Sequence, residues 1–204
     1  MDNNYTHISL VVDRSGSMTD VRDDAQKGID TLLTDQFAQD GKLTVTLTQF
    51  DDKIDTVKRL ARKIFKYQLQ PRGWTALLDA VGQEIVKTGE DLAALPEDER
   101  PAKVLFVVVT DGYENASKEY NTEKIKALVD TQKDVYKWEF QFIGADQAAW
   151  AGAQLGMATT QYVGTATGTQ TMYNNLSTST SLFRANANVS FAMPSVLEEE
   201  ESNV

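Results

Sequence analysis

Residues 13–17 (DRSGS) combine residue types and a spacing that suit a hard metal cation. Asp13, Ser15 and Ser17 occupy alternate positions, so a curled loop presents their oxygens on one side, and Gly16 permits the tight curl. Carboxylate and hydroxyl oxygens are good ligands for Mg²⁺ and poor ones for zinc or copper. Because the apolar run His7–Val12 leads directly into this loop, we expect Asp13 at the end of a buried strand.

Two further segments offer the same kind of oxygen donor. Asp111 directly follows the apolar run Lys103–Thr110, and Thr75 lies in residues 73–77 (GWTAL), a loop that opens a predicted helix. Ligands of parallel α/β sheets bind beyond the carboxyl ends of the strands. If the two apolar runs are neighbouring strands, Asp13, Thr75 and Asp111 converge there. Each segment alone also fits a helix cap or a turn, and it is the three together that favour a metal site.

This set of donors predicts binding rather than catalysis. Mg²⁺ takes about six oxygen ligands, and neutral hydroxyls leave its charge incompletely balanced, so a carboxylate from another molecule becomes a strong additional ligand. A phosphohydrolase with a metal beside a strand-end aspartate is the alternative. Such an enzyme needs a second carboxylate two residues on, where Ser15 stands. The single histidine, His7, lies at the opposite end of its strand and supplies no general base to the site.

The composition argues against several other classes of protein. The 204 residues, 41% apolar and 25% charged, suit one soluble globular domain with little beyond it. Thirty acidic and twenty basic side chains give a net charge of −10, which argues against a nucleic-acid partner. Cysteine is absent, which excludes disulfides and thiolate metal sites. No apolar run approaches the roughly 18 residues that cross a bilayer, and the first residues lack signal-peptide features, so we expect a cytoplasmic protein without a membrane partner.

Strand and helix patterns alternate along the chain, which is typical of a doubly wound α/β fold. The predicted strands are His7–Val12, Leu43–Phe50, Ile54–Val57, Lys103–Thr110, Trp138–Ile143 and Thr160–Val163. Apolar spacing predicts helices from Val21 to Phe37, from Leu77 to Leu92, around Ile125–Val129 after an Asn121-Thr122 cap, over Ala148–Leu155, and within residues 168–185. The Asp51-Asp52-Lys53 turn makes Ile54–Val57 the hairpin partner of Leu43–Phe50.

Three segments of the chain, VVDRSGSM, RGWTALLDA and VVVTDGYENAS, resemble the signature segments of the von Willebrand factor A domain. The similarity covers roughly residues 5–165, and QFIGADQAAW resembles the fifth strand of bacterial and phage intracellular members. The resemblance implies a mostly parallel, doubly wound sheet of six strands, with helices on both faces and one short antiparallel edge strand. It also divides the chain into a domain at 1–165, a C-terminal helix on or near it at 166–190, and an acidic, disordered tail at 191–204.

Members of this family carry a metal-ion-dependent adhesion site, and the resemblance places the corresponding ligands in this chain. They are Asp13, Ser15, Ser17, Thr75 and Asp111. The implied ion is Mg²⁺, with Mn²⁺ or Ca²⁺ as alternatives, and the implied partner is a protein that presents Asp or Glu. Several members work with AAA-type ATPase systems. The resemblance therefore favours a non-enzymatic adaptor or scaffold module, and the alternative is a structural or assembly component of a phage or intracellular complex.

Residues beside the predicted ligands are candidates for a partner-binding rim. Arg14 lies within the first loop, Trp74 stands where a glycine is common in the family, and Tyr113 and Glu114 follow Asp111. The simpler interpretation of each is a solvated loop side chain.

The stretch from Lys58 to Arg72 contains six basic residues and no acidic one. Leu60, Ile64 and Phe65 are spaced like an apolar stripe beneath them. The stretch fits either a solvated helix face or a basic patch that steers an acidic partner toward the metal loops.

Overall fold

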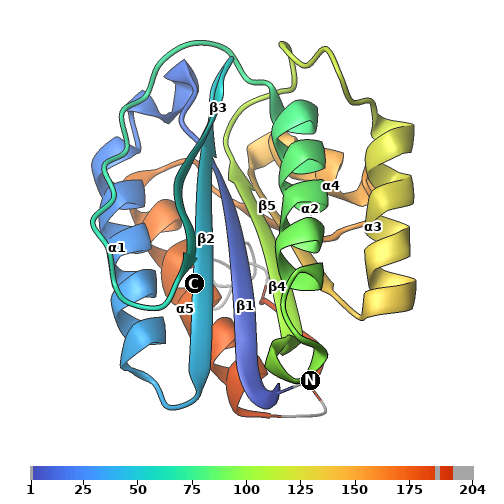
Figure 1. Cartoon of the computed structure of the whole chain (residues 1–204). Coiled ribbons are helices and arrows are strands. Elements are labelled where there is room, and N and C mark those ends of the chain that lie inside the picture. The colour runs from blue at the N-terminus through green and yellow to red at the C-terminus, as the bar shows by residue number, and fades with distance from the viewer. Residues whose placement is uncertain (1, 187–188, 195–204) are drawn as a thin grey trace.

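The computed structural model describes residues 2–186 and 189–194, and the chain alternates strands and helices through them (Figure 1). The strands are β1 (Asp2–Asp13), β2 (Lys42–Phe50), β3 (Ile54–Ala61), β4 (Pro101–Thr110), β5 (Glu139–Ala145) and β6 (Ala158–Tyr162). The α-helices are α1 (Arg22–Ala38), α2 (Leu77–Ala93), α3 (Thr122–Tyr136), α4 (Trp150–Gln154) and α5 (Ala166–Ala185). Short 3₁₀ helices are η1 (Gly16–Thr19), η2 (Glu97–Glu99) and η3 (Asp146–Ala149).

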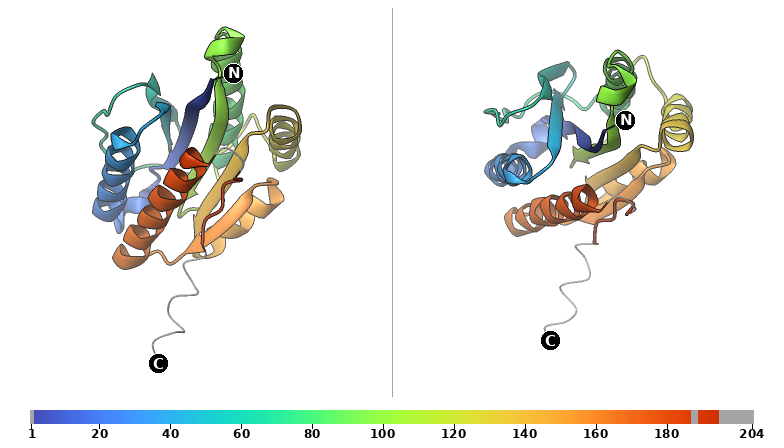
Figure 2. Two further views of the ribbon diagram at one scale, coloured as in Figure 1. Left: turned by 90° about the horizontal axis from the view of Figure 1, so that it is seen from below. Right: turned by 60° about the horizontal axis from the view of Figure 1, so that its bottom comes forward.

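The six strands form one sheet in the order β3-β2-β1-β4-β5-β6. Every neighbouring pair is parallel except β2 and β3, which are antiparallel. Helices α1 and α5 cover one face of the sheet, and α2 and α3 cover the other (Figures 1 and 2). The predicted fold, a doubly wound and mostly parallel sheet with one antiparallel edge strand, is confirmed.

The central strands are buried on both faces, which explains their nearly unbroken apolar sequences. In β1, Leu10 packs toward α1 and α5, whereas Val11 packs toward α2. In β4, Val107 likewise packs toward α1 and α5, and Phe106 packs toward α2. The two apolar clusters therefore hold β1 and β4 side by side at the centre of the sheet.

Helix ends follow local capping chemistry. The side chain of Asn121 accepts a hydrogen bond from the Lys124 N–H at 3.0 Å and begins α3, as the sequence predicts. The hydroxyl of Thr165 accepts one from the Gly168 N–H at 3.1 Å and begins α5 two residues before the predicted range. Lys137 ends α3 in the left-handed conformation, with φ of 58°.

The basic stretch 58–72 is not a helix, which corrects that interpretation of the sequence. Strand β3 continues to Ala61, and an extended loop then connects it with α2 along the outer side of α1 (Figure 1). Leu60 has a positive φ of 48°, and its N–H donates to the Thr46 hydroxyl at 3.1 Å. The polar residues of α1 then hold the loop, because the Gln26 side chain bonds to the backbone of Tyr67 and Leu69.

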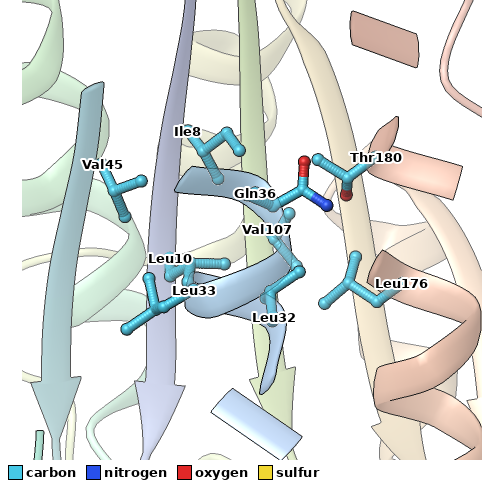
Figure 3. A pocket seen from close by; sticks show the side chains of 9 residues that line it. All are labelled: Ile8, Leu10, Leu32, Leu33, Gln36, Val45, Val107, Leu176 and Thr180. Carbon is cyan, nitrogen blue, oxygen red and sulfur yellow. The ribbon is translucent and has the colours of Figure 1, made fainter. Parts of the chain in front are cut away.

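The apolar side chains of helix α5 pack into the core cluster that lies between the sheet and α1. Met172 and Leu176 lie in the same apolar cluster as β1 and α1, and Phe191 packs edge-on against Phe183 with ring centroids 6.0 Å apart. Figure 3 shows where α1 and α5 meet over β1, β2 and β4, around a small cavity of about 10 Å³. Of the expected tail, residues 195–204 lie outside the described part of the chain.

Among the described residues, no helix is both long and apolar enough to cross a membrane.

Candidate metal centre

Three loops meet at the carboxyl edge of the sheet, where β1 and β4 end next to each other. The last paired residues of these strands are Val12 and Val109. Asp13 and Thr110 therefore stand side by side at the start of their loops. The loop that precedes α2 completes the group, because the Gly16 N–H donates to the Gly73 carbonyl at 3.3 Å.

Asp13 is fully buried and tightly held. One carboxylate oxygen, Oδ1, accepts a hydrogen bond from the Ser15 N–H at 2.6 Å, and the other, Oδ2, accepts one from the Thr110 hydroxyl at 2.5 Å. Burial raises the pKa of Asp13 to about 6, although these hydrogen bonds act in the opposite direction. A cation bound next to this carboxylate offsets the cost of burying its charge.

Ser15, Ser17 and Asp111 form a chain of oxygens beside Asp13. The hydroxyls of Ser15 and Ser17 share a hydrogen bond of 3.0 Å, and the Ser17 hydroxyl donates to Asp111 Oδ1 at 2.5 Å. Burial is the largest influence on Asp111 and raises the pKa of its carboxyl above the ordinary value. Hydroxyl protons thus occupy positions that a cation would take between these oxygens.

Gly112 shows how closely the donors surround one point. A Cβ atom built on Gly112 would lie 3.0 Å from Thr75 Oγ1, 3.3 Å from Asp13 Oδ2 and 3.3 Å from Ser17 Oγ. Oxygens from two loops therefore converge beside Gly112 of the third loop, on a space that exists because residue 112 has no side chain. Two carboxylates and three hydroxyls in this arrangement fit a hard divalent cation. Histidine and cysteine take no part, and no cluster of three or more His, Cys, Asp or Glu that could hold a metal occurs among the described residues.

The Thr75 loop is fixed by backbone hydrogen bonds to the loop that follows β4. The Thr75 N–H donates to the Asn115 side chain at 2.8 Å, and the Asn115 N–H donates to the Thr75 carbonyl at 3.0 Å. Gly73 adopts a φ of +70°, which favours glycine, directly before Trp74. These contacts set the position of the Thr75 hydroxyl relative to Asp111.

Two carboxylates hold the start of α2 against the same loop. Glu114 accepts a hydrogen bond from the Leu78 N–H at 2.9 Å, and Asp79 accepts from three successive backbone N–H groups at 2.7–2.9 Å. The three donors are Lys118, Glu119 and Tyr120. Glu114 also accepts from the N–H groups of Ala116 and Ser117. Its carboxylate is therefore committed to the loop, which corrects the expectation that it lines a partner-binding rim.

Arg14 is likewise not a rim residue. Its side chain is only 5% exposed, lies 2.9 Å from Asp51 and forms an ion pair with Asp55. Asp51 also pairs with Arg72 at 2.7 Å. Burial alone would raise the pKa of Asp51, but hydrogen bonds from Arg72 and Lys53 and the charge of Arg14 hold it below the ordinary value.

Trp74 and Tyr113 do flank the centre as exposed side chains. Trp74 is 68% exposed and Tyr113 is 59% exposed. They belong to the two loops that the Thr75–Asn115 hydrogen bonds join. Aromatic rings exposed beside a polar centre are typical of surfaces that bind another molecule.

Sequence reasoning missed Thr110 and Asp51. Thr110 is the one hydroxyl at the end of the apolar run Lys103–Thr110, and its position beside Asp13 depends on the pairing of β1 with β4. Asp51 looks like part of a hairpin turn, but its side chain is buried and pairs with Arg14 and Arg72. The available signal was a polar residue at the end of a buried strand for Thr110 and directly after one for Asp51.

No model of a protein family and no curated protein sequence matches this chain. Solved structures do. Proximal thread matrix protein 1 from the mussel byssus is 13% identical with a TM-score of 0.58, over 86% of this chain and 46% of the mussel chain. A second structure of that protein, described as having a zinc-occupied MIDAS motif (the metal-ion-dependent adhesion site), is 14% identical with a TM-score of 0.57, over the same shares.

A bacterial structure is similar over nearly its full length. The von Willebrand factor domain of the type V pili tip protein Mfa5 from Porphyromonas gingivalis is 10% identical with a TM-score of 0.57, over 91% of this chain and 98% of the other. By contrast, this chain spans about half the length of the mussel protein. The described chain therefore has the von Willebrand factor A fold, and at these identities the similarity concerns the fold alone.

Proposed function

We propose that this protein is a divalent-metal-dependent protein-binding module. Asp13, Ser15, Ser17, Thr75 and Asp111 hold Mg²⁺, and a carboxylate of a partner protein completes the coordination. The ion supplies an electron-poor binding position for that carboxylate. The observation that carries the proposal is the convergence of Thr75, Asp13 and Ser17 oxygens on the space beside Gly112.

The chain's own residues have distinct parts in this proposal. Asp13 and Asp111 supply negative charge, and Thr110 and the Ser15 N–H orient Asp13. Trp74 and Tyr113 offer apolar surface next to the partner's carboxylate. The similar structures come from adhesion and matrix proteins, one with a zinc-occupied site of this kind, and these descriptions are consistent with protein binding.

Binding rather than catalysis fits the residues at the centre. Ser15 occupies the position where a phosphohydrolase would need its second carboxylate. His7 is buried in the middle of β1, away from Asp13, and burial lowers its pKa to about 3, so it does not act as a base near neutral pH. Mg²⁺-dependent turnover of p-nitrophenyl phosphate that disappears in Asp13→Ala would contradict this part of the proposal.

Metal binding is tested first with the ion alone. Isothermal titration of Mg²⁺ and electron paramagnetic resonance of Mn²⁺ should show one site in the wild-type chain. Asp13→Ala and Thr75→Ala should weaken binding by at least tenfold. Asp98→Ala, which removes an exposed carboxylate from η2 at the other end of the sheet, is the matched control and should bind normally. Unchanged affinity in Asp13→Ala would refute the site.

Partner capture is tested with the native host. Immobilised wild-type protein should retain a partner in Mg²⁺ and release it in EDTA, and Asp13→Ala should retain none while keeping a cooperative unfolding transition. Capture that persists in excess EDTA would overturn metal dependence. We propose an intracellular setting in bacteria or phage, with an AAA-type ATPase system as partner, and mass spectrometry of the Mg²⁺-dependent proteins tests it.

An assembly role is the alternative, and the exposed rings of Trp74 and Tyr113 are consistent with it. Size-exclusion chromatography with light scattering, with and without Mg²⁺, distinguishes the two. A lone binding module keeps one mass in both conditions, whereas an assembling component grows in mass when Mg²⁺ is present.

A further inference from the structure

The end of β3 and the connection that follows it carry a concentration of positive charge. Four cations, Lys58, Arg62, Lys63 and Lys66, are exposed there within nine residues. We call these four residues the cationic ridge. Ile64 lies between them and is 56% exposed, the only large apolar side chain of the ridge segment 58–66 that faces solvent to this extent.

The backbone beneath the ridge is anchored. Ala61 and Tyr67 are buried, and Phe65 packs against the core cluster that includes α1. The Tyr67 carbonyl also accepts a hydrogen bond from Gln26 at 3.0 Å. The ridge therefore presents its charges from a fixed segment of chain.

The ridge cations are unpaired, unlike the other basic residues of the same stretch. Arg59 turns inward and pairs with Glu84 and Asp91 at 2.8 Å, and Arg72 pairs with Asp51. The four ridge residues form no ion pair with any residue that the structure describes. In a chain with a net charge of −10, this is a localised positive surface whose cations have no ion-pair partner among the described residues.

The chain itself contains a segment of matching chemistry. Residues 195–204 (SVLEEEESNV) carry four consecutive glutamates and no basic residue, and Val196 and Leu197 directly precede the glutamates. Four negative charges beside an apolar pair complement four positive charges around Ile64. Ten extended residues reach at most roughly 33–36 Å from Pro194, and attachment to the same chain raises the effective concentration of the segment.

We propose that residues 195–204 dock on the cationic ridge of the same chain. The docked glutamates then compete with any acidic partner that approaches the metal centre across the ridge, because the ridge loop continues directly into Trp74 and Thr75. This contact goes beyond the proposed metal-dependent function and requires no metal, so it is tested in EDTA.

Because the chain has no cysteine, one introduced cysteine can carry a spin label at a single position. We would attach a nitroxide to Ser202→Cys in the full ¹⁵N-labelled chain and record paramagnetic broadening of backbone amides at low salt. We expect severalfold weaker signals for amides 62–66, and unchanged signals for the exposed Lys118 amide on another loop. Absent broadening on the ridge, or equal broadening of both segments, would overturn the proposal.

Charge is tested with a variant of equal length. Changing Glu198, Glu199, Glu200 and Glu201 to Gln should abolish the broadening, as should 0.5 M NaCl, which shortens the screening length to below about 5 Å. Persistent broadening in both would overturn an electrostatic contact. Mixing spin-labelled ¹⁴N protein with unlabelled ¹⁵N protein detects contacts between copies, and broadening in that mixture equal to the original would overturn docking within one chain.

Discussion

At the scale of single residues, Thr110 is the support on which the buried Asp13 carboxylate depends. Its hydroxyl donates to Asp13 Oδ2 at 2.5 Å and also accepts from the Gly112 N–H at 3.0 Å. It thus connects one proposed ligand with the loop that carries another. Residues that orient metal ligands typically change affinity about 10–100-fold when they are replaced.

Thr110→Val should therefore weaken Mg²⁺ binding by about tenfold or more. The substitution keeps the shape of the side chain but removes the donor, and it should also lower the free energy of unfolding by about 1–2 kcal/mol. Calorimetric titration and urea unfolding measure the two effects. Thr34→Val, at an exposed position of α1, should leave metal affinity unchanged. Equal affinities of Thr110→Val and wild type would show that Asp13 needs no such support.

His7 makes a second prediction at this scale, because burial, with a contribution from the charge of Arg59, lowers its pKa to about 3, against a smaller opposing effect of Asp91. In the unfolded chain, His7 takes up a proton near pH 6.5, whereas in the folded chain it does so only near pH 3. This contribution to stability is therefore complete above pH 6.5 and is lost as the pH falls. Between pH 7 and pH 4.5 the loss is about 2–3 kcal/mol.

Urea unfolding of wild type and His7→Gln at both pH values checks the effect. Comparison of the two proteins cancels the titration of the carboxylates. The variant should lose less stability on acidification than the wild type, by the amount given above. Parallel losses in the two proteins would contradict a neutral, buried His7.

The sequence was sufficient to predict that Asp13, Ser15, Ser17 and Asp111 lie close together, because the first three are joined by local spacing and Asp111 follows a recognisable strand. That they hold a metal stays a prediction. The sequence was insufficient for Arg14. Whether that side chain faces solvent depends on Asp51, which comes from the end of another strand 37 positions along the sequence. An ion pair such as Arg14–Asp51 depends on which strands are neighbours in the sheet, and the local spacing of residues does not reveal the order of the strands.

At the scale of elements, the start of α2 and the loop after β4 form one hydrogen-bonded unit. Asp79 accepts three backbone N–H groups from that loop, and the Asp79 N–H donates to the Ser117 hydroxyl at 3.0 Å. The side chains of Glu114 and Asn115 in turn accept hydrogen bonds from the N–H groups of Leu78 and Thr75. The spacing of Thr75 from Asp111 is thus set by the packing of a helix on a loop.

Asp79→Ala should lower the free energy of unfolding by about 2–4 kcal/mol, because three partly buried hydrogen bonds lose their acceptor. It should also weaken Mg²⁺ binding, although Asp79 is not among the proposed ligands. Gln83→Ala is the matched control, since Gln83 contacts Glu119 of the same loop through one exposed hydrogen bond of 3.0 Å. A destabilised Asp79→Ala that binds Mg²⁺ normally would show that the loop keeps its shape without the helix.

Local sequence patterns predict the bounds of some helices and strands and not of others. Helix α3 was predicted to its first residue, because Asn121 caps it within four residues of sequence. The stretch after Val57 was not, since its apolar residues suit a helix, whereas β2 extends β3 to Ala61 and α1 holds the loop that follows. Tertiary contacts overrode local propensity there.

At the scale of the whole molecule, α5 joins the end of the chain to α1. Polar side chains join the two helices. The buried Gln36 side chain donates to the Ser177 carbonyl at 3.0 Å, and the Arg184 guanidinium donates to the Gln36 side-chain oxygen. The two helices are also close, because Gly28 of α1 faces the ring of Tyr173. A Cβ built on Gly28 would lie 2.3 Å from that ring.

Gly28→Ala should therefore destabilise the protein by about 1–3 kcal/mol through overpacking. Combining it with Tyr173→Leu, which removes the ring, should cost less than the sum of the two single changes. Thermal unfolding of the four proteins measures the coupling. Gly89→Ala on α2, where the added methyl has its nearest neighbour at 3.7 Å, should be tolerated. Strict additivity of the Gly28 and Tyr173 changes would refute the close contact.

The place of β1 in the sheet has a consequence for how this protein is made. Of the six strands of this sheet, β1 is synthesised before the others and lies between β2 and β4, yet β4 begins only at Pro101. A nascent chain must therefore keep one edge of β1 uncovered until β4 has emerged, and long-range pairing of this kind slows folding. Asp111 emerges directly after that partner strand, so a growing chain completes its set of proposed ligands at nearly the same moment as its central pairing.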